Sequence, residues 1–445
     1  MDKSIINIIL EQNPWWSDPS ATVGDKSKFR RDIFETIKIR VIDRELITAI
    51  VGLRRVGKTT LVRQVINFLM ESGIDRQKIL YFSCENLEGK QSSELLQEII
   101  KYQVKKYPDE KTYFFFDEIQ YIDGWNVILK KYFDLYPKLK FTVTGSASLF
   151  IATKARESLA GRIQEVVVYP MGYAEYLRIN KNIDIPAVNI FDNIELLVPH
   201  SVVLEENFQP YLAWGEFPYL ENLPTWDEKK EYILEFVLRK VLEVDLPRLK
   251  KFNGTELSRL MDILVVGSGQ LVEMQNLGAD LGLSQNTLRD YLNTLEKTYL
   301  ISQVFNKGIG YRTRSVRQRK IYVNCVNAVV LKSGLTFDPN VWQIKAGLFV
   351  ENYVFNYLKR LQMGEIDFWR ERQVREVDFV YNYQGIKLPI EVKYQNQIRP
   401  EDLKNISYYC HKEKLNKAVV ITKNKMGTEK IKDLRVQFIP AHYLI

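Results

Sequence analysis

The segment from Gly52 to Thr59, GLRRVGKT, constrains the fold of this chain more than any other feature. It fits the phosphate-binding pattern G-x-x-x-x-G-K-[ST] at every fixed position. The apolar residues 46–51 before it predict a buried parallel strand, and the apolar spacing of residues 60–69 after it predicts a helix. Strand, loop and helix in this order predict a parallel α/β sheet with a nucleotide site at its carboxyl edge.

The loop has the residue types that phosphate binding requires. Its glycines allow the backbone N–H groups to point at phosphate oxygens, and the following helix N-terminus adds partial positive charge. Lys58 is predicted to reach the outer phosphates of ATP, and the Thr59 hydroxyl to bind Mg²⁺. The predicted nucleotide-binding residues are Gly52, Leu53, Arg54, Arg55, Val56, Gly57, Lys58, Thr59 and Thr60.

A second phosphate-site element follows at residues 113–118, YFFFDE. Four large apolar residues are typical of a strand buried on both faces, and two carboxylates end it. We expect Asp117 to complete the Mg²⁺ shell and Glu118 to orient and polarise the attacking water.

Polar residues also follow a third predicted strand, 141–144. Thr144 or Ser146 is expected to contact the γ-phosphate or the water, and Ser146 is slightly preferred. An ordinary Gly-Ser turn is the alternative for each. Farther on, Arg156 and Arg162 are candidates for neutralising transition-state charge. Arg162 is the catalytic candidate, in cis or on a neighbouring subunit, and an exposed helix arginine is its alternative.

These elements resemble the AAA-type P-loop ATPases, and more narrowly an archaeal and bacterial ATPase family with a long C-terminal extension. The resemblance covers residues 1–180. It implies an AAA-like ATPase domain that binds ATP and Mg²⁺ and hydrolyses ATP. The segments that carry it are Asn13-Pro-Trp-Trp16, Gly52–Thr60, Phe116-Asp-Glu-Ile-Gln120 with Trp125, Thr144-Gly-Ser146, Leu159-Ala-Gly-Arg162 and Tyr169-Pro170.

Length and composition limit the remaining possibilities. A chain of 445 residues is expected to form two to four domains, and 46% hydrophobic with 27% charged residues indicates an ordered protein. Three widely separated cysteines argue against a disulfide framework and favour a reducing cytoplasm. We find no signal peptide and no membrane-spanning run, and therefore expect no membrane partner. The net charge of +8 weakly favours an anionic partner.

The middle of the chain is expected to contain a linker and helical connector at 181–250, with a helix stopped by Pro247, and a winged helix-turn-helix at 251–330. Ser284 is placed to cap a recognition helix from which Gln285, Asn286 and Arg289 could face a DNA groove. A packing module is the alternative. A basic stretch without acidic residues follows, and wing hairpins often carry such charge to phosphates. Its cations in the predicted wing are Lys307, Arg312, Arg314, Arg317, Arg319 and Lys320.

The C-terminal residues 340–445 contain a second set of carboxylates. Glu351 lies in a predicted helix, and Asp378 and Glu391 lie in two strands that a turn at 382–385 joins. If the strands pair, the two carboxylates lie side by side and suit a second Mg²⁺ or Mn²⁺. Lys393, on the same strand face as Glu391, would then orient or activate water.

This ordered set resembles the PD-(D/E)XK, restriction-endonuclease-like α/β fold, although Glu376-Val377 replaces the proline before the aspartate. The resemblance implies a nuclease site of Glu351, Asp378, Glu391 and Lys393 and leaves open whether the domain cleaves or only packs.

Together these segments predict a multidomain α/β protein in which ATP state controls DNA binding or processing. Nucleic acid, with DNA preferred, is the expected partner, and a homo-oligomer is possible. One alternative is a nucleotide-gated switch acting on a protein partner, with an inert C-terminal domain. Another is a metal-dependent nuclease that ATP licenses.

Overall fold

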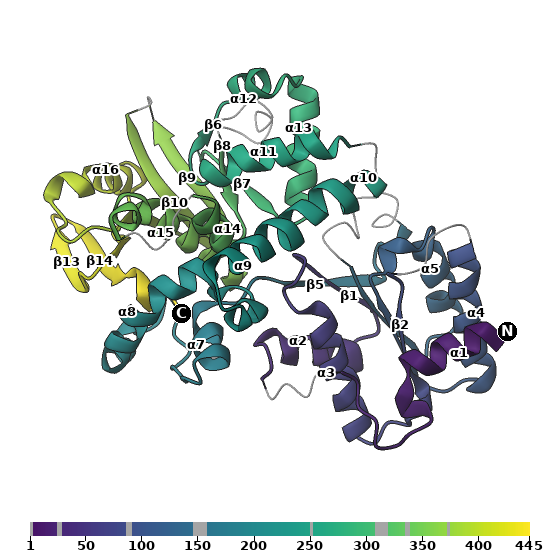
Figure 1. Cartoon of the computed structure of the whole chain (residues 1–445). Coiled ribbons are helices and arrows are strands. Elements are labelled where there is room, and N and C mark those ends of the chain that lie inside the picture. Colours follow the sequence, from purple (N-terminus) through teal and green to yellow (C-terminus); the bar gives the residue numbers. More distant parts are fainter. Residues whose placement is uncertain are drawn as a thin grey trace. The chain divides into compact units, whose positions relative to one another are not determined.

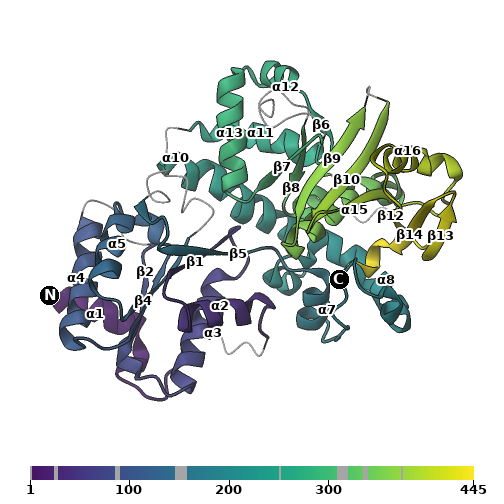
Figure 2. The same cartoon turned by 180° about the vertical axis from the view of Figure 1, so that it is seen from behind.

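The structure of the protein is a computed structural model. It describes residues 3–24, 29–85, 91–145, 158–249, 252–307, 319–333, 339–371 and 374–445. The chain forms two compact units (Figures 1 and 2). One contains Met1–Tyr169 with Arg248–Lys251, and the other contains Pro170–Pro247 with Phe252–Ile445. The domain boundaries predicted within the second unit stay predictions.

The first unit is built on a five-stranded sheet in the order β2-β3-β4-β1-β5, and all its strand pairs are parallel. The strands are β1 (Ile47–Gly52), β2 (Ile79–Ser83), β3 (Thr112–Asp117), β4 (Leu139–Thr144) and β5 (Ile163–Val168). Because β1 and β3 are buried along their whole length, they read as continuous apolar runs. The predicted α/β class is confirmed.

Helices flank this sheet. The helices α2 and α3 pack on each other and on β1, whereas α4 packs on α5, which contacts β4. Their bounds are α1 (Lys3–Gln12), α2 (Ile33–Ile42), α3 (Lys58–Glu71), α4 (Gln91–Lys106) and α5 (Trp125–Leu135), with short 3-10 helices at Pro14–Trp16, Arg76–Lys78 and Ile119–Tyr121.

The edge strand β2 is covered by the N-terminal segment. The Asn13 side chain accepts from Tyr81 N at 2.7 Å and donates to Tyr81 O at 2.8 Å, so it pairs with the strand as a neighbouring backbone would. The indole nitrogens of Trp15 and Trp16 both donate to Ile79 O. Side chains therefore satisfy edge groups that would otherwise invite pairing with another chain.

The second unit starts with helical segments that pack around buried tyrosines. The predicted stop at Pro247 is wrong, because the helical run from Trp226 continues to Leu249. Pro247 is the second residue of α10, which directly follows the π-helical turn at Val241–Asp245. The segments are α7 (Tyr173–Asn180), α8 (Ser201–Pro210), α9 (Trp226–Glu231) and α10 (Leu246–Leu249), 3-10 helices at Ile194–His200 and Pro218–Asn222, and π-helical turns at Tyr211–Gly215, Tyr232–Arg239 and Val241–Asp245.

A small antiparallel sheet, in the order β6-β8-β7, follows with three helices before its last two strands. The chain order is α11 (Gly254–Val266), β6 (Leu271–Val272), α12 (Met274–Leu281), α13 (Gln285–Lys297), β7 (Ile301–Phe305), β8 (Arg319–Val323) and α14 (Val326–Lys332). Arg312, Arg314 and Arg317 lie outside the described residues.

The C-terminal part is a six-stranded mixed sheet in the order β13-β14-β12-β11-β10-β9. The helix α16 covers one face through a core that includes Val380, Ile406 and Val436. The helix α15 contacts β10 and β11. The elements are α15 (Pro339–Leu361), β9 (Glu365–Glu371), β10 (Arg375–Tyr383), β11 (Ile386–Lys393), α16 (Lys404–Glu413), β12 (Lys417–Thr422), β13 (Gly427–Ile431) and β14 (Leu434–Pro440), with 3-10 turns at Pro400–Leu403 and Ala441–Tyr443. Within the described part of the chain, no helix combines the length and apolarity needed to cross a bilayer.

Candidate functional site

The predicted phosphate-binding loop joins the carboxyl end of β1 to the N-terminus of α3. Gly52 has φ 146° and Gly57 has φ 99°, a region that residues with a Cβ rarely adopt. A Cβ on Gly52 would lie 2.2 Å from Val168 O of the neighbouring strand. The two glycines of the motif therefore allow the backbone path that brings the loop to the first turn of α3.

Lys58 begins α3 and is 5% exposed. Its ammonium donates to Leu53 O at 2.9 Å and Gly52 O at 3.3 Å, so the side chain folds back over the loop that it follows. This places the positive charge inside the loop, where the outer phosphates of a nucleotide are expected to bind.

Asp117 is the centre of a hydrogen-bond network at the carboxyl edge of the sheet. Its Oδ2 accepts from Thr59 Oγ1 at 2.9 Å and from the Tyr81 hydroxyl at 3.0 Å, and its Oδ1 accepts from the Thr144 hydroxyl. Burial raises the pKa of Asp117, and these hydroxyl groups oppose the shift. The predicted pair Thr59 and Asp117 therefore lies together, and three strands and α3 position it.

Glu118, the second predicted carboxylate, follows Asp117 directly. It has φ 54°, the left-handed conformation, and its N–H donates to Thr144 Oγ1 at 3.0 Å. The Gln120 amide donates to its carboxylate. Thr144 thus fixes both carboxylate residues, one through its hydroxyl hydrogen and the other through its oxygen.

Sequence reasoning missed Tyr81 and ranked Thr144 second. The signal for Tyr81 was available, because period two along the strand places it on the same side as Ser83, which pairs with Asp117. Ser146 and Arg156 lie outside the described residues.

The residues present fit Mg²⁺. A threonine hydroxyl and a carboxylate 2.9 Å apart are the oxygen donors that this ion prefers. A cation beside Asp117 would also relieve the cost of burying its charge, which raises its pKa.

Arg162 lies at the opposite edge of the sheet. In the β1–β5 pairing, Ile163 faces Ile47 and Val168 faces Gly52, so Arg162 precedes the strand whereas the loop follows it. A strand of this length spans about 20 Å, which is farther than an arginine side chain reaches. Its Nε donates instead to Asp134 Oδ1 at 2.7 Å. Of the two alternatives left open for Arg162, a role on its own nucleotide would need a reach that this geometry does not give, and a role on a neighbouring subunit stays a prediction.

The predicted C-terminal set also comes together. In the β10–β11 hairpin Phe379 faces Ile390, which places Asp378 beside Glu391. Asp378 Oδ2 accepts from Val392 N at 2.8 Å, and Lys393 Nζ lies 2.7 Å from Glu391 Oε1.

Lys320 of β8 enters this set from outside the C-terminal sheet. Its Nζ lies 2.7 Å from Glu376 Oε1, 3.1 Å from Glu351 Oε1 and 3.6 Å from Asp378 Oδ1. The Tyr322 hydroxyl donates to Glu351 Oε1 at 2.7 Å. We call Glu351, Glu376, Asp378 and Glu391 the acidic cluster.

The prediction that Arg319 and Lys320 carry charge to DNA from a wing is therefore wrong. Each is only 3% exposed, because both faces of β8 are covered by other parts of the protein, and Lys320 faces the acidic cluster. Arg319 donates to Gln303 Oε1 at 2.7 Å. Lys307, the first cation of the stretch, donates to Asn382.

Burial shapes the electrostatics of the acidic cluster. It raises the pKa of Glu391 to about 8 and that of Glu351 to about 6, with Asp378 adding to both. Burial alone would lower the pKa of Lys320, but Tyr322, Glu351 and the other carboxylates raise it well above its ordinary value.

The second metal that the endonuclease-like resemblance implies does not fit this arrangement. Asp378 and Glu391, its predicted ligands, already neutralise the ammonium groups of Lys320 and Lys393. Among the residues that the structure describes, no three His, Cys, Asp or Glu side chains converge as a metal-binding group.

The predicted recognition helix is α13. Ser284 Oγ accepts from Thr287 N at 3.1 Å and caps it, after Gly282 turns the chain with φ 68°. Gln285 and Asn286 are exposed, whereas Arg289 is half-buried.

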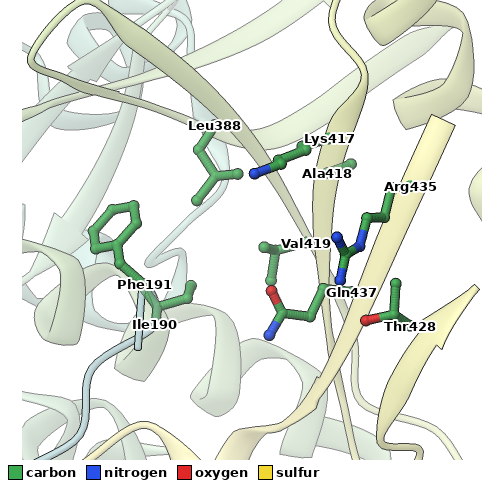
Figure 3. A pocket seen from close by; sticks show the side chains of 9 residues that line it. All are labelled: Ile190, Phe191, Leu388, Lys417, Ala418, Val419, Thr428, Arg435 and Gln437. Carbon is green, nitrogen blue, oxygen red and sulfur yellow. The ribbon is translucent and has the colours of Figure 1, made fainter. Parts of the chain in front are cut away.

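A separate cavity of about 220 Å³ lies on the C-terminal sheet (Figure 3). Phe191 and Leu388 lie on one side of it, and polar side chains of β12, β13 and β14 lie on the other. None of the predicted site residues lines it. The lining residues are Ile190, Phe191, Leu388, Lys417, Ala418, Val419, Thr428, Arg435 and Gln437.

Three regions of the chain match family models. Residues 44–177 match a family described as an AAA domain. Residues 205–325 and 346–444 match two families described as domains of unknown function, DUF8612 and DUF4143.

Curated relatives extend over most of the chain. The uncharacterized protein MJ1637 of Methanocaldococcus jannaschii is 29% identical over 359 residues, which cover 75% of this chain and 72% of the relative. An uncharacterized protein of Haemophilus influenzae is 24% identical over 432 residues, which cover 93% and 98%.

Similar solved structures include AMPPCP-bound DnaA from Aquifex aeolicus, with 11% identity, a TM-score of 0.25 and coverage of 64% of this chain and 92% of that one. A DNA polymerase III gamma subunit-related protein from Thermotoga maritima has 12% identity, a TM-score of 0.23 and coverage of 74% and 85%. The domain match and the parallel sheet with its loop agree, and residues 44–177 are an AAA-type, ATPase-like domain.

Proposed function

We propose that this protein is a Mg²⁺-dependent ATPase. The observation that carries the proposal is the network in which Thr59, Tyr81 and Thr144 converge on Asp117 beside the loop at Gly52. Bound Mg²⁺ would neutralise phosphate charge, with Thr59 and Asp117 holding it. Lys58 contributes a second positive charge, and the loop N–H groups orient the phosphates.

Glu118 is proposed to orient and polarise the attacking water. Its backbone is fixed by Thr144, and its side chain by Gln120, so the carboxylate has a defined direction. A preoriented base lowers the barrier because little reorganisation remains during the reaction.

The test compares ATP binding with steady-state hydrolysis in wild type, Lys58→Ala and Glu118→Gln. We expect Lys58→Ala to lose both and Glu118→Gln to bind ATP but not turn it over. Wild-type turnover by Glu118→Gln would contradict the role of this carboxylate.

We further propose that ATP state controls DNA binding. The order helix, strand, two helices and two strands, from α11 to β8, supports a winged helix-turn-helix. Gln285 and Asn286 stand exposed at the start of α13, where base contacts are made in such modules. Since Arg319 and Lys320 are buried, phosphate contacts are assigned to Arg312, Arg314 and Arg317.

This proposal predicts salt-sensitive duplex binding and DNA-stimulated ATP hydrolysis. Gln285→Ala and Asn286→Ala should each weaken binding, whereas Gln270→Ala, an exposed amide outside α13, should not. Equal affinities for all three variants would contradict readout by α13.

A nucleotide-gated switch acting on a protein is the second candidate, and the charge of α13 favours it. Its outer positions carry Asp290 and Glu296 beside Arg289 and Lys297, so the helix is not basic. Hydrolysis that DNA leaves unchanged, with a stable protein partner in pull-downs, would support this candidate.

We also propose a homo-oligomer in which Arg162 reaches the nucleotide of a neighbour, in the cytoplasm that three free, buried cysteines suit. Subunits with Arg162→Ala and with Glu118→Gln would then be inactive alone, and mixing them should restore hydrolysis. If mixing does not restore hydrolysis, Arg162 does not act on the nucleotide of a neighbouring subunit, and its role is the structural contact with Asp134.

A further inference from the structure

We propose that Lys320 is the resident cation of the acidic cluster, so that the endonuclease-like C-terminal domain binds no divalent metal while β8 is in place. The proposal is independent of ATP hydrolysis. Lys320 neutralises the carboxylates that the sequence analysis predicts as metal ligands.

The geometry places one ammonium among three carboxylates. Lys320 Nζ is 2.7 Å from Glu376, 3.1 Å from Glu351 and 3.6 Å from Asp378, so it lies where these side chains converge. A metal ion bridging Glu351 and Asp378 would need the same space. The Lys320 ammonium and the metal ion would use the same lone pairs of the carboxylate oxygens.

Aromatic packing holds Lys320 in position. Tyr322, two residues farther along β8, stacks on Phe355 of α15 with ring centroids 4.4 Å apart and an interplanar angle of 11°. Its ring also contacts Phe379 of β10. Since residues two apart on a strand share a face, this stacking directs Lys320 into the cluster.

The small sheet also joins the C-terminal sheet through backbone. Lys307 N donates to Phe368 O at 2.7 Å, and the Asn306 side chain pairs with the backbone of Arg370 in both directions. Figures 1 and 2 show β7 and β8 beside β9 and β10. The end of β7 is therefore attached to β9, and β7 in turn pairs with β8, the strand that carries Lys320.

Burial keeps Lys320 and Glu391 from a phosphodiester, although the side chains of Glu351, Glu376 and Asp378 are partly exposed. Lys320 and Glu391 are each 3% exposed. Gly269 packs closely against Glu351, since a Cβ added to this glycine would lie 3.2 Å from Glu351 Oε1. Cleavage requires a phosphate oxygen and a water beside the metal. With β8 seated, neither has access to Glu391.

Charge favours a replacement cation once Lys320 is removed. Among the described residues, the four carboxylates of the cluster contact three cationic groups, namely Lys320, Lys393 and Arg370, which pairs with Glu376. Without Lys320 the excess of negative charge grows, and the oxygen donors of Glu351, Asp378 and Glu391 become those of a Mg²⁺ or Mn²⁺ site.

The experiment measures Mn²⁺ binding by the electron paramagnetic resonance of the free ion. Full-length, nucleotide-free proteins all carry Asp117→Asn, which removes the ATP-site ligand. We compare this background protein with four variants made in it: Glu391→Gln, Lys320→Met, Lys320→Met with Glu391→Gln, and Lys332→Met. Lys332 pairs with Asp262 on the same module and is the matched control.

We expect Lys320→Met to gain one Mn²⁺ site. Its affinity for Mn²⁺ should be about tenfold or more above that of the background protein, and a tenfold change is equivalent to about 1.4 kcal/mol. Glu391→Gln should remove the gain, and Lys332→Met should resemble the background protein. Two results would overturn the proposal: Mn²⁺ binding by the background protein that Glu391→Gln abolishes, or a folded Lys320→Met without a new site.

Lys320→Met leaves buried carboxylates uncompensated and could unfold the domain, so a second variant adds Glu376→Gln to restore the charge balance. A circular dichroism spectrum establishes which variants are folded. The measurement on the background protein and its Glu391→Gln variant involves no change at Lys320, and it decides the proposal even if both Lys320 variants fail to fold.

Discussion

Thr144→Val is the most direct test of the ATPase site. Valine has the shape of threonine but no hydroxyl, so the change removes the hydrogen bond to Asp117 Oδ1 and the acceptor for Glu118 N. Thr144 is only 1% exposed, and water cannot readily take the place of the hydroxyl. Both carboxylate residues lose the contact that fixes their position.

The expected loss is worked out from the hydrogen bond to Asp117, the charged partner of the two. A hydrogen bond to a charged group contributes about 1.5–3 kcal/mol, and each 1.36 kcal/mol in the barrier is tenfold in rate. Thr144→Val should therefore lower kcat by about 10- to 100-fold. ATP affinity should change little, because Lys58 and the loop, which hold the phosphates, are untouched.

Steady-state hydrolysis and nucleotide binding measure the two quantities separately. Thr142→Val is the control, since Thr142 is 2% exposed and lies two residues earlier on the same face of β4. Thr144→Ser, which keeps the hydroxyl, should recover most of the rate. A Thr144→Val enzyme with wild-type kcat, or an equal loss in Thr142→Val, would refute the role assigned to this network.

Three further predictions concern stability. Asn13→Ala should destabilise the first unit by about 3 kcal/mol in urea unfolding, because three buried hydrogen bonds at about 1 kcal/mol each are lost; an effect below about 1 kcal/mol would contradict the edge-strand role. Burial raises the pKa of Glu216 to about 7, so this group contributes stability that is complete below pH about 4.5 and is lost as pH rises through 7. Glu216→Gln should flatten that pH dependence, which is on the order of 3 kcal/mol, and an unchanged profile would exclude Glu216 as its source. Lys320→Met should lower the free energy of unfolding by about 3–5 kcal/mol, as the loss of one partner of a buried ion pair does. A variant with wild-type stability in urea unfolding would show that the carboxylates of the cluster do not need this cation.

The ATPase site was predictable because its signals are local. Gly52, Gly57 and Lys58 lie within one loop, and the strand that ends in Asp117 is apolar along its length. A parallel sheet brings the carboxyl ends of such strands to one edge. Thr144 was undervalued against Ser146 because sequence alone does not fix which residue of a strand end points at its neighbour.

Arg319 and Lys320 were misassigned for a different reason. Their side chains are placed by strand direction and by packing between segments far apart in the chain. A run of cations resembles a solvated face, yet packing on both faces of β8 buries Arg319 and Lys320. The acids that neutralise Lys320 lie 31 or more residues away, at Glu351, Glu376 and Asp378, and no local pattern connects them.

The two carboxylate pairs illustrate how one sequence signal leads to two chemistries. Asp117-Glu118 and Asp378 with Glu391 both follow or lie in apolar strands, and both predict a metal. At Asp117 the neighbours are hydroxyl groups, which stabilise the carboxylate without cancelling its charge, so attraction for Mg²⁺ is retained. At Asp378 and Glu391 the neighbours are ammonium groups of the same chain, which cancel that attraction. The nature of the nearest partner, rather than the spacing of the carboxylates, therefore decides whether such a pair is available to a metal ion.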